Sequence, residues 1–149
     1  DFFDDPFFLA EADPAVIRTL EDPARQRTYQ AGAPYKEALQ VALANLKAVS
    51  DGGATIAMGT DSGPPARFQG YFEHLELELM AEAGLTPIQI LVASTSAAAR
   101  CIGLEEVGTL EAGKLADFVV TTANPLDDIT NTRTIESVWI SGNEVPRQR

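Results

Sequence analysis

The sequence predicts an α/β fold with a second, all-β part, and three observations lead to this prediction. Residues 36–50 carry leucines at helical spacing and end at the pair Gly52-Gly53, a common left-handed helix stop. The wholly apolar run 54–58 follows directly; it is too short for a helix and suits a parallel strand buried on both faces. Beyond Glu105 the period changes to short β-branched runs separated by glycine turns. Helix, tight turn and buried strand in this order are typical of α/β proteins.

The first 35 residues predict loops around short helices. Short apolar clusters alternate there with acidic turns, and prolines recur at Pro6, Pro14, Pro23 and Pro34. Asp13 is expected to cap a helix that Pro14 opens, because an aspartate accepts from free backbone N–H groups and proline fits the first helical turn.

Residues 71–83 predict an amphipathic helix after a loop rich in glycine and proline, and Gly84 is expected to end it. Its apolar stripe consists of Phe72, Leu75, Leu79 and Ala83.

A further helix is predicted to begin after Thr86. Thr86 as N-cap, Pro87 at the first helical position and Gln89 three residues after the cap form a capping-box signature. The helical pattern then continues to Gly103.

Residues 105–145 predict strands of a separate antiparallel sheet. Trp139 alternates with its apolar neighbours and is expected in the core of this part. Asp117 precedes the strand-like run FVV, where a turn-capping role is expected and no chemistry.

The composition is that of an ordinary globular protein, with 149 residues, 45% hydrophobic content and a formal net charge of −11. This acidity disfavours nucleic acid and anionic membrane surfaces as partners. No run approaches the roughly 18 apolar residues of a membrane span. The first residue is Asp1 and not Met, so we expect it to be an internal position of a longer protein.

One histidine, His74, and one cysteine, Cys101, limit the metal chemistry of the chain. A catalytic zinc site usually needs about three protein ligands drawn mainly from His, Cys and carboxylates. Cys101 lies in an alanine-rich helix end and is expected to be a small core residue. A complete zinc site is therefore not expected from these residues alone.

Asp61 is the first candidate for chemistry, because it follows the predicted strand within GTDSG. Strand carboxyl ends are where α/β enzymes hold catalytic groups. A carboxylate there can ligate a metal or accept a proton from a water that the metal has acidified. The alternative is a structural Asx turn with Ser62 and Gly63.

His74 and Arg67 are candidates for contact with a substrate. On a helical wheel His74 falls opposite the apolar stripe, which predicts a solvent-facing side chain. It also lies in the first turn after the Asp61 loop, from which it could lean over a cleft. Arg67 is the one cation in that loop, and it could pair with a substrate carboxylate or with the neighbouring acidic helix.

Four segments together resemble the C-terminal third of the metal-dependent amidohydrolase superfamily, in particular its imidazolonepropionase-like and prolidase-like members: GTDSG, EAGLTPIQIL, SAAARCIGLEEVGTLEAGKLADFVV, and NPLDDI with the later VWISG. The resemblance runs from about Tyr35 to Val145. Its most specific element is Gly108-x-Leu110-x-x-Gly113-Lys114-x-Ala116-Asp117. It implies that residues 1–104 are the last strand and helices of a TIM-like (β/α)8 barrel. It also implies that residues 105–149 are the C-terminal part of a small composite β-sandwich.

The resemblance also implies a metal centre. In the family this centre uses an H-x-H pair, a lysine or glutamate, two later histidines and the aspartate that ends the eighth strand, and only that aspartate has a counterpart here, Asp61. It implies zinc or another divalent metal, with one or two ions in the full-length protein and none held stably by these residues alone. Asp61 would be a metal ligand and the proton shuttle.

The function implied is hydrolysis of a C–N bond in an amide, a peptide or a cyclic amide, by a protein of which this chain is an inactive part. The expected partners are a small-molecule substrate, such as a dipeptide or a cyclic amide, and the missing N-terminal part of the same chain; a homo-oligomer is compatible with them. The alternatives are a non-catalytic scaffold of the same fold and an acidic binding module.

Overall fold

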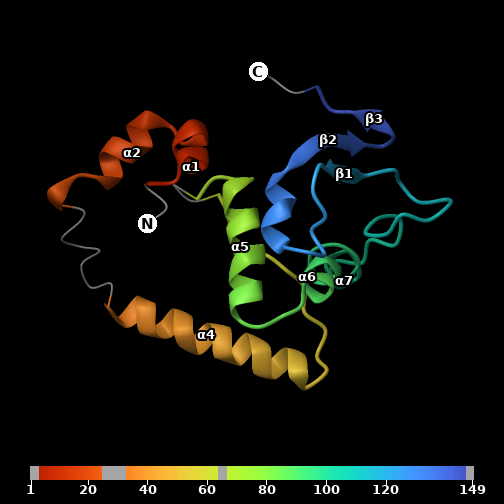
Figure 1. The fold of residues 1–149 in the computed structure, drawn as a ribbon, viewed down its shortest axis with the longest axis horizontal. Coiled ribbons are helices and arrows are strands. Elements are labelled where there is room, and N and C mark those ends of the chain that lie inside the picture. The colour runs from red at the N-terminus through yellow and green to blue at the C-terminus, as the bar shows by residue number, and fades with distance from the viewer. Residues whose placement is uncertain (1–3, 25–32, 64–66, 147–149) are drawn as a thin grey trace.

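The computed structural model describes residues 4–24, 33–63 and 67–146, and Figure 1 shows their arrangement. Helix α5 (Tyr71–Glu82) stands at the centre of the view, with α1 (Pro6–Glu11) and α2 (Pro14–Leu20) at its upper end and α4 (Ala33–Asp51) below. Helices α6 (Pro87–Ser94) and α7 (Ser96–Cys101) follow it in the chain. Among the described residues, no helix combines the length and the apolar character that a membrane crossing needs.

The predicted N-terminal helices are confirmed, and their caps explain them. Asp13 accepts a hydrogen bond from the Ala15 N–H at 2.7 Å, and Pro14 occupies the first helical position of α2. Asp5 accepts in the same way from the Phe7 N–H at 2.9 Å at the start of α1. Each aspartate satisfies a backbone donor that the helix cannot.

Helix α4 is confirmed and ends as predicted, because Gly53 adopts a left-handed φ of 83°. Its leucines differ in burial along the helix. Leu43 is buried, Leu46 packs against the core, and Leu39 is exposed. Only the second half of α4 therefore packs against the rest of the described chain.

The strand predicted at 54–58 is not formed among the described residues. A strand needs a neighbouring strand to satisfy its backbone groups, and none of the described residues pairs with this segment. At the end of this segment, the Met58 N–H donates a hydrogen bond to the Ala93 carbonyl of α6 at 3.0 Å. The prediction that this segment is buried on both faces is wrong, because Met58 packs against the core whereas Ala57 is exposed.

The main core surrounds the second half of α5, with Met80 and Ile90 as its most deeply buried members. Its buried residues are Leu77, Met80, Leu85, Ile90, Ala93 and Ile129. A second group, the aromatic cluster, surrounds the first turn of α5 and consists of Phe8, Ala12 and Tyr71 with Phe68 and Phe72 packed against them. Helix α5 thus joins two cores. Its buried residues, Tyr71, Leu77 and Met80, all lie outside the predicted stripe, whose four members are half-buried.

The capping box at Thr86 is confirmed, with the Thr86 N–H donating to Gln89 Oε1 at 2.8 Å. The prediction that this helix continues to Gly103 is wrong, because the helix breaks at Thr95 into α6 and α7. The hydroxyls of Ser94 and Thr95 donate to carbonyls one turn earlier, at 3.0 Å to Ile90 and 2.6 Å to Leu91. Such bonds bend helices. Cys101, predicted in the core, is exposed at the end of α7, which corrects that prediction.

The predicted antiparallel sheet is confirmed, in the order β1-β2-β3. Its strands are β1 (Phe118–Thr121), β2 (Ile135–Ile140) and β3 (Asn143–Glu144), with the 3-10 helix η3 (Ile129–Arg133) between the first two. Trp139 pairs with Phe118 across the strands, and their rings stack at 5.6 Å. Asp117 has the predicted structural role, because its carboxylate accepts from the Ser141 N–H at 2.6 Å.

Gly108 is the glycine at which the loop before β1 approaches the α6–α7 corner most closely. A Cβ there would lie 2.8 Å from Ala99 Cβ and 3.0 Å from Ser96 Cα, and φ is 86°. Gly113 also has a left-handed φ, of 96°, yet nothing lies within 4 Å of a Cβ built on it.

We expect Gly108→Ala to lower the free energy of unfolding by about 2–5 kcal/mol, because left-handed strain and overpacking add. Gly113→Ala should cost only the strain, about 1–2 kcal/mol. Urea unfolding followed by Trp139 fluorescence measures both. Equal losses in the two variants would contradict the close packing at Gly108.

Candidate functional site

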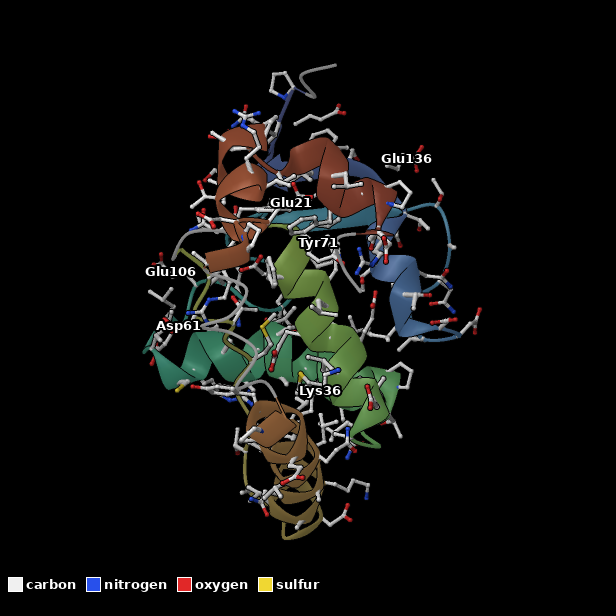
Figure 2. All side chains as sticks on the ribbon, turned by 90° about the vertical axis from the view of Figure 1, so that its left-hand side faces the viewer. Glu21, Lys36, Asp61, Tyr71, Glu106 and Glu136 are labelled. Carbon is white, nitrogen blue, oxygen red and sulfur yellow. The ribbon has the colours of Figure 1, made fainter. Side chains whose placement is uncertain are left out.

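Asp61 follows the irregular segment that leads from α4 past the main core. Its side chain is exposed, and its backbone has a left-handed φ of 50°, which is unusual for a residue with a Cβ. Figure 2 shows Asp61 at the margin of the molecule, away from Tyr71. Its carboxylate takes part in no hydrogen bond or salt bridge recorded among the described residues.

The Asx turn considered for Asp61 is not formed, which corrects that alternative. The Ser62 N–H donates instead to Thr60 Oγ1 at 3.2 Å, and the Gly63 N–H donates to the Arg67 carbonyl at 2.7 Å. The turn is therefore closed by the hydroxyl of Thr60 and by the backbone. The Asp61 carboxylate therefore accepts from neither of these two amides, and Pro64 and Pro65 lie outside the described residues.

Glu73 anchors the Asp61 turn to the first turn of α5. Its Oε1 accepts from Ser62 Oγ at 2.6 Å and from Thr60 Oγ1 at 2.9 Å, and its Oε2 accepts from the Gly70 N–H at 2.5 Å. Burial raises the pKa of Glu73, but these hydrogen bonds to the ionised form outweigh it and hold the pKa below its ordinary value. The carboxylate is thus kept charged.

His74 is half-buried and not solvent-facing, so the wheel-based prediction is wrong. Its Nδ1 lies 3.0 Å from Thr132 Oγ1 of η3. Burial lowers the pKa of His74, the charge of Arg133 lowers it further, and the carboxylates of Glu78 and Glu73 oppose this. The wheel failed because α5 is covered on several sides, including the side that η3 contacts.

Arg67 is exposed, and no salt bridge joins it to a described residue. The pairing with the acidic helix that the sequence offered is therefore not found within the described ranges. Asp61, Arg67 and His74 belong to one loop and the helix turn after it, yet no recorded hydrogen bond joins any two of these side chains among the described residues.

Sequence reasoning missed a polar junction that ties two other elements, η3 and the start of α1, to α5. Arg133 donates to Glu78 Oε1 at 2.6 Å and lies 5.0 Å from the ring centre of Tyr71. The Tyr71 hydroxyl in turn donates to Asp5 Oδ2 at 3.0 Å. No local pattern could have found it, because Asp5 and Arg133 lie far apart in the sequence. Glu73 could have been found, because it stands three residues after Gly70 at capping-box spacing.

The donor set fits a metal ion only in part. An exposed carboxylate without internal hydrogen bonds suits a divalent cation such as Zn²⁺. Across the part of the chain that the structure describes, no three His, Cys, Asp or Glu residues are grouped so that they could hold an ion. A metal ion at Asp61 would therefore need further ligands from outside the described residues.

Comparison with known proteins supports the resemblance. The family model described as "Amidohydrolase family" matches residues 36–145. The 5-methylthioadenosine/S-adenosylhomocysteine deaminase of Bacillus cereus is 28% identical over 123 residues, which are 78% of this chain and 25% of that protein. The chain thus spans about a quarter of the length of the curated relatives it matches.

Solved structures agree with this match. A putative prolidase from Bifidobacterium longum is 36% identical, with a TM-score of 0.64 over 68% of this chain and 25% of that one. Phenylurea hydrolase B is 27% identical, with a TM-score of 0.64 over 90% of this chain and 31% of that one.

We expect acidification from pH 7.5 to 5.5 to destabilise the protein, and His74→Gln to reduce this loss. The folded pKa of His74 lies below the ordinary 6.5, so the unfolded chain binds more protons in this window. Stability therefore falls as the pH drops through 6.5 towards the folded pKa. Urea midpoints at about pH 7.5 and 5.5 measure it. An unchanged pH dependence in His74→Gln would assign the loss to other groups.

Proposed function

This chain belongs to the amidohydrolase family, and we propose from that premise that its protein hydrolyses a C–N bond in a small molecule. Asp61 is the proposed metal ligand and proton shuttle. The observation that carries the proposal is the state of its carboxylate, which is exposed, outside its own turn and without a recorded hydrogen bond or salt bridge within the described chain. A residue with only a structural role in a turn would use that carboxylate in the turn.

The proposed cofactor is zinc or another divalent metal, as one or two ions. When bound, such an ion polarises the substrate carbonyl and lowers the pKa of water to about 7. Asp61 would take the proton of the attacking water and pass it to the leaving nitrogen.

Arg67 and His74 are the proposed substrate contacts. The Arg67 guanidinium is exposed and without a salt bridge to a described residue, so it is available to pair with a substrate carboxylate. Burial favours the neutral form of His74, and because its Nδ1 is paired with Thr132 Oγ1, the Nε2 is the ring nitrogen proposed to contact the substrate. A carboxylate and an amide together are the features of a dipeptide; a cyclic amide is the other proposed substrate.

The proposed architecture places the remaining metal ligands outside this chain. Residues 1–104 would be the last strand and helices of a (β/α)8 barrel, and residues 105–149 the C-terminal part of a β-sandwich. The segment 54–58 would then become a strand once barrel neighbours supply its backbone partners. The small sheet would gain strands in the same way.

A non-catalytic scaffold of this fold is the second candidate. It is favoured by the absence of a ligand group of three among the described residues. An H-x-H pair after a short apolar strand, upstream of this chain, would favour the enzyme.

We expect Asp61→Asn in the zinc-loaded full-length protein to lower turnover of a dipeptide or cyclic amide by about 10² or more, the scale of lost acid–base catalysis. The amide keeps the size of the side chain but cannot accept a full proton. The control is Asp127→Asn, another exposed aspartate, which should leave turnover within about twofold. Unchanged turnover in metal-loaded Asp61→Asn would remove Asp61 from the reaction.

We also expect the 149-residue chain by itself to bind zinc no more tightly than an ordinary acidic surface, since one ligand does not close a site. Dialysis against a chelator followed by metal analysis measures this. Stoichiometric zinc that survives the dialysis would contradict it, and His74→Gln would then show whether His74 is a ligand.

A further inference from the structure

We propose that Glu73 is a positioning residue for Asp61. Among the described residues no hydrogen bond joins Glu73 to Asp61, and in the proposed function, on which this inference rests, Glu73 does not bind the substrate. It acts through the two residues that flank Asp61, because the hydroxyls of Thr60 and Ser62 both donate to its Oε1, at 2.9 Å and 2.6 Å.

The backbone at Asp61 explains why such an anchor is needed. A φ of 50° is disfavoured for a residue with a Cβ, so Asp61 adopts it only where the surroundings impose it. Bonds to the residues immediately before and after Asp61 restrain the backbone on both sides. Without them, the turn can relax towards ordinary φ values and redirect the carboxylate.

The charge of Glu73 makes the anchor strong. Hydrogen bonds from hydroxyls to an ionised carboxylate are shorter and stronger than those between neutral groups, and the 2.6 Å bond from Ser62 has the length expected. Thr60, Ser62 and Glu73 are all partly buried, whereas Asp61 is exposed. The partly buried groups thus form a base from which Asp61 projects.

A purely structural role has to be separated from this one, because Glu73 also caps a helix. Its Oε2 accepts from the Gly70 N–H, just as Gln89 Oε1 accepts from the Thr86 N–H at the start of α6. Both residues stand at the third helical position. Among the described residues Gln89 forms no hydrogen bond with the Asp61 turn, so Gln89→Ala is a matched control that removes a cap and leaves the turn unchanged.

The experiment compares Glu73→Ala, Glu73→Gln, Ser62→Ala and Gln89→Ala in the zinc-loaded full-length protein. Hydrogen exchange of the Ser62 and Gly63 amides reports the order of the turn, because both amides are hydrogen-bonded there. Turnover of a dipeptide provides kcat and KM separately. Ser62→Ala removes one donor to Glu73 but keeps the sequence of α5 and the bond from the Gly70 N–H to Glu73. It therefore decides the question if Glu73→Ala fails to fold.

We expect Glu73→Ala to speed exchange at these amides about tenfold or more and to lower kcat about 10- to 100-fold with little change in KM. Ser62→Ala should shift both in the same direction by less. Glu73→Gln, which keeps an oxygen acceptor, should recover part of the loss. Gln89→Ala should change neither readout beyond about twofold.

Two results would overturn the inference. One is exchange at Ser62 and Gly63 that stays at the wild-type rate in both Glu73→Ala and Ser62→Ala. The other is an equal effect of Gln89→Ala, which would reduce Glu73 to a helix cap. If the wild-type protein hydrolyses no C–N bond while Glu73→Ala still frees the turn, the positioning of Asp61 stands and the proposed function fails.

Discussion

Burial of α5 on several sides is the constraint from which the candidate site takes its shape. No residue from 71 to 81 is fully exposed. Phe8 and Tyr71 pack edge-to-face at 5.2 Å around the first turn, and Met80 lies in the main core near the last. A helix held at both ends cannot rotate to expose another face. Its third residue, Glu73, is therefore a fixed point, and the Asp61 turn is tied to it.

The charges around α5 are arranged by the same packing. Arg133 of η3 pairs with Glu78 and lies over Tyr71, whose hydroxyl bonds Asp5 of the N-terminal helices. Both members of the Arg133–Glu78 pair are only about a quarter exposed, so the pair is less screened than a surface salt bridge. The same guanidinium opposes protonation of His74. Burial is the main cause of the lowered pKa of His74; within the junction, the charge of Arg133 lowers that pKa further and the charge of Glu78 opposes it.

Local chemistry could be predicted from the sequence, and contacts between distant residues could not. Asp13 and Thr86 cap helices because their partners lie within three residues. Segment 54–58 was predicted as a strand, but strands depend on neighbours, and none is present among the described residues. The prediction of a solvent-facing His74 was wrong for a similar reason, since a helical wheel assumes one buried face and α5 has several. Within the site, the sequence pointed to Asp61, while its anchor on Glu73 needed the fold.

The proposed role of Asp61 as a ligand of a catalytic metal can be tested directly. Crystals of the full-length protein with zinc, measured at the zinc absorption edge, would locate the ion directly. We expect an ion with one Asp61 carboxylate oxygen at about 2.0–2.2 Å and histidines from outside this chain completing the shell. Zinc bound elsewhere, with Asp61 turned to solvent in a protein that still hydrolyses its substrate, would contradict the proposed role.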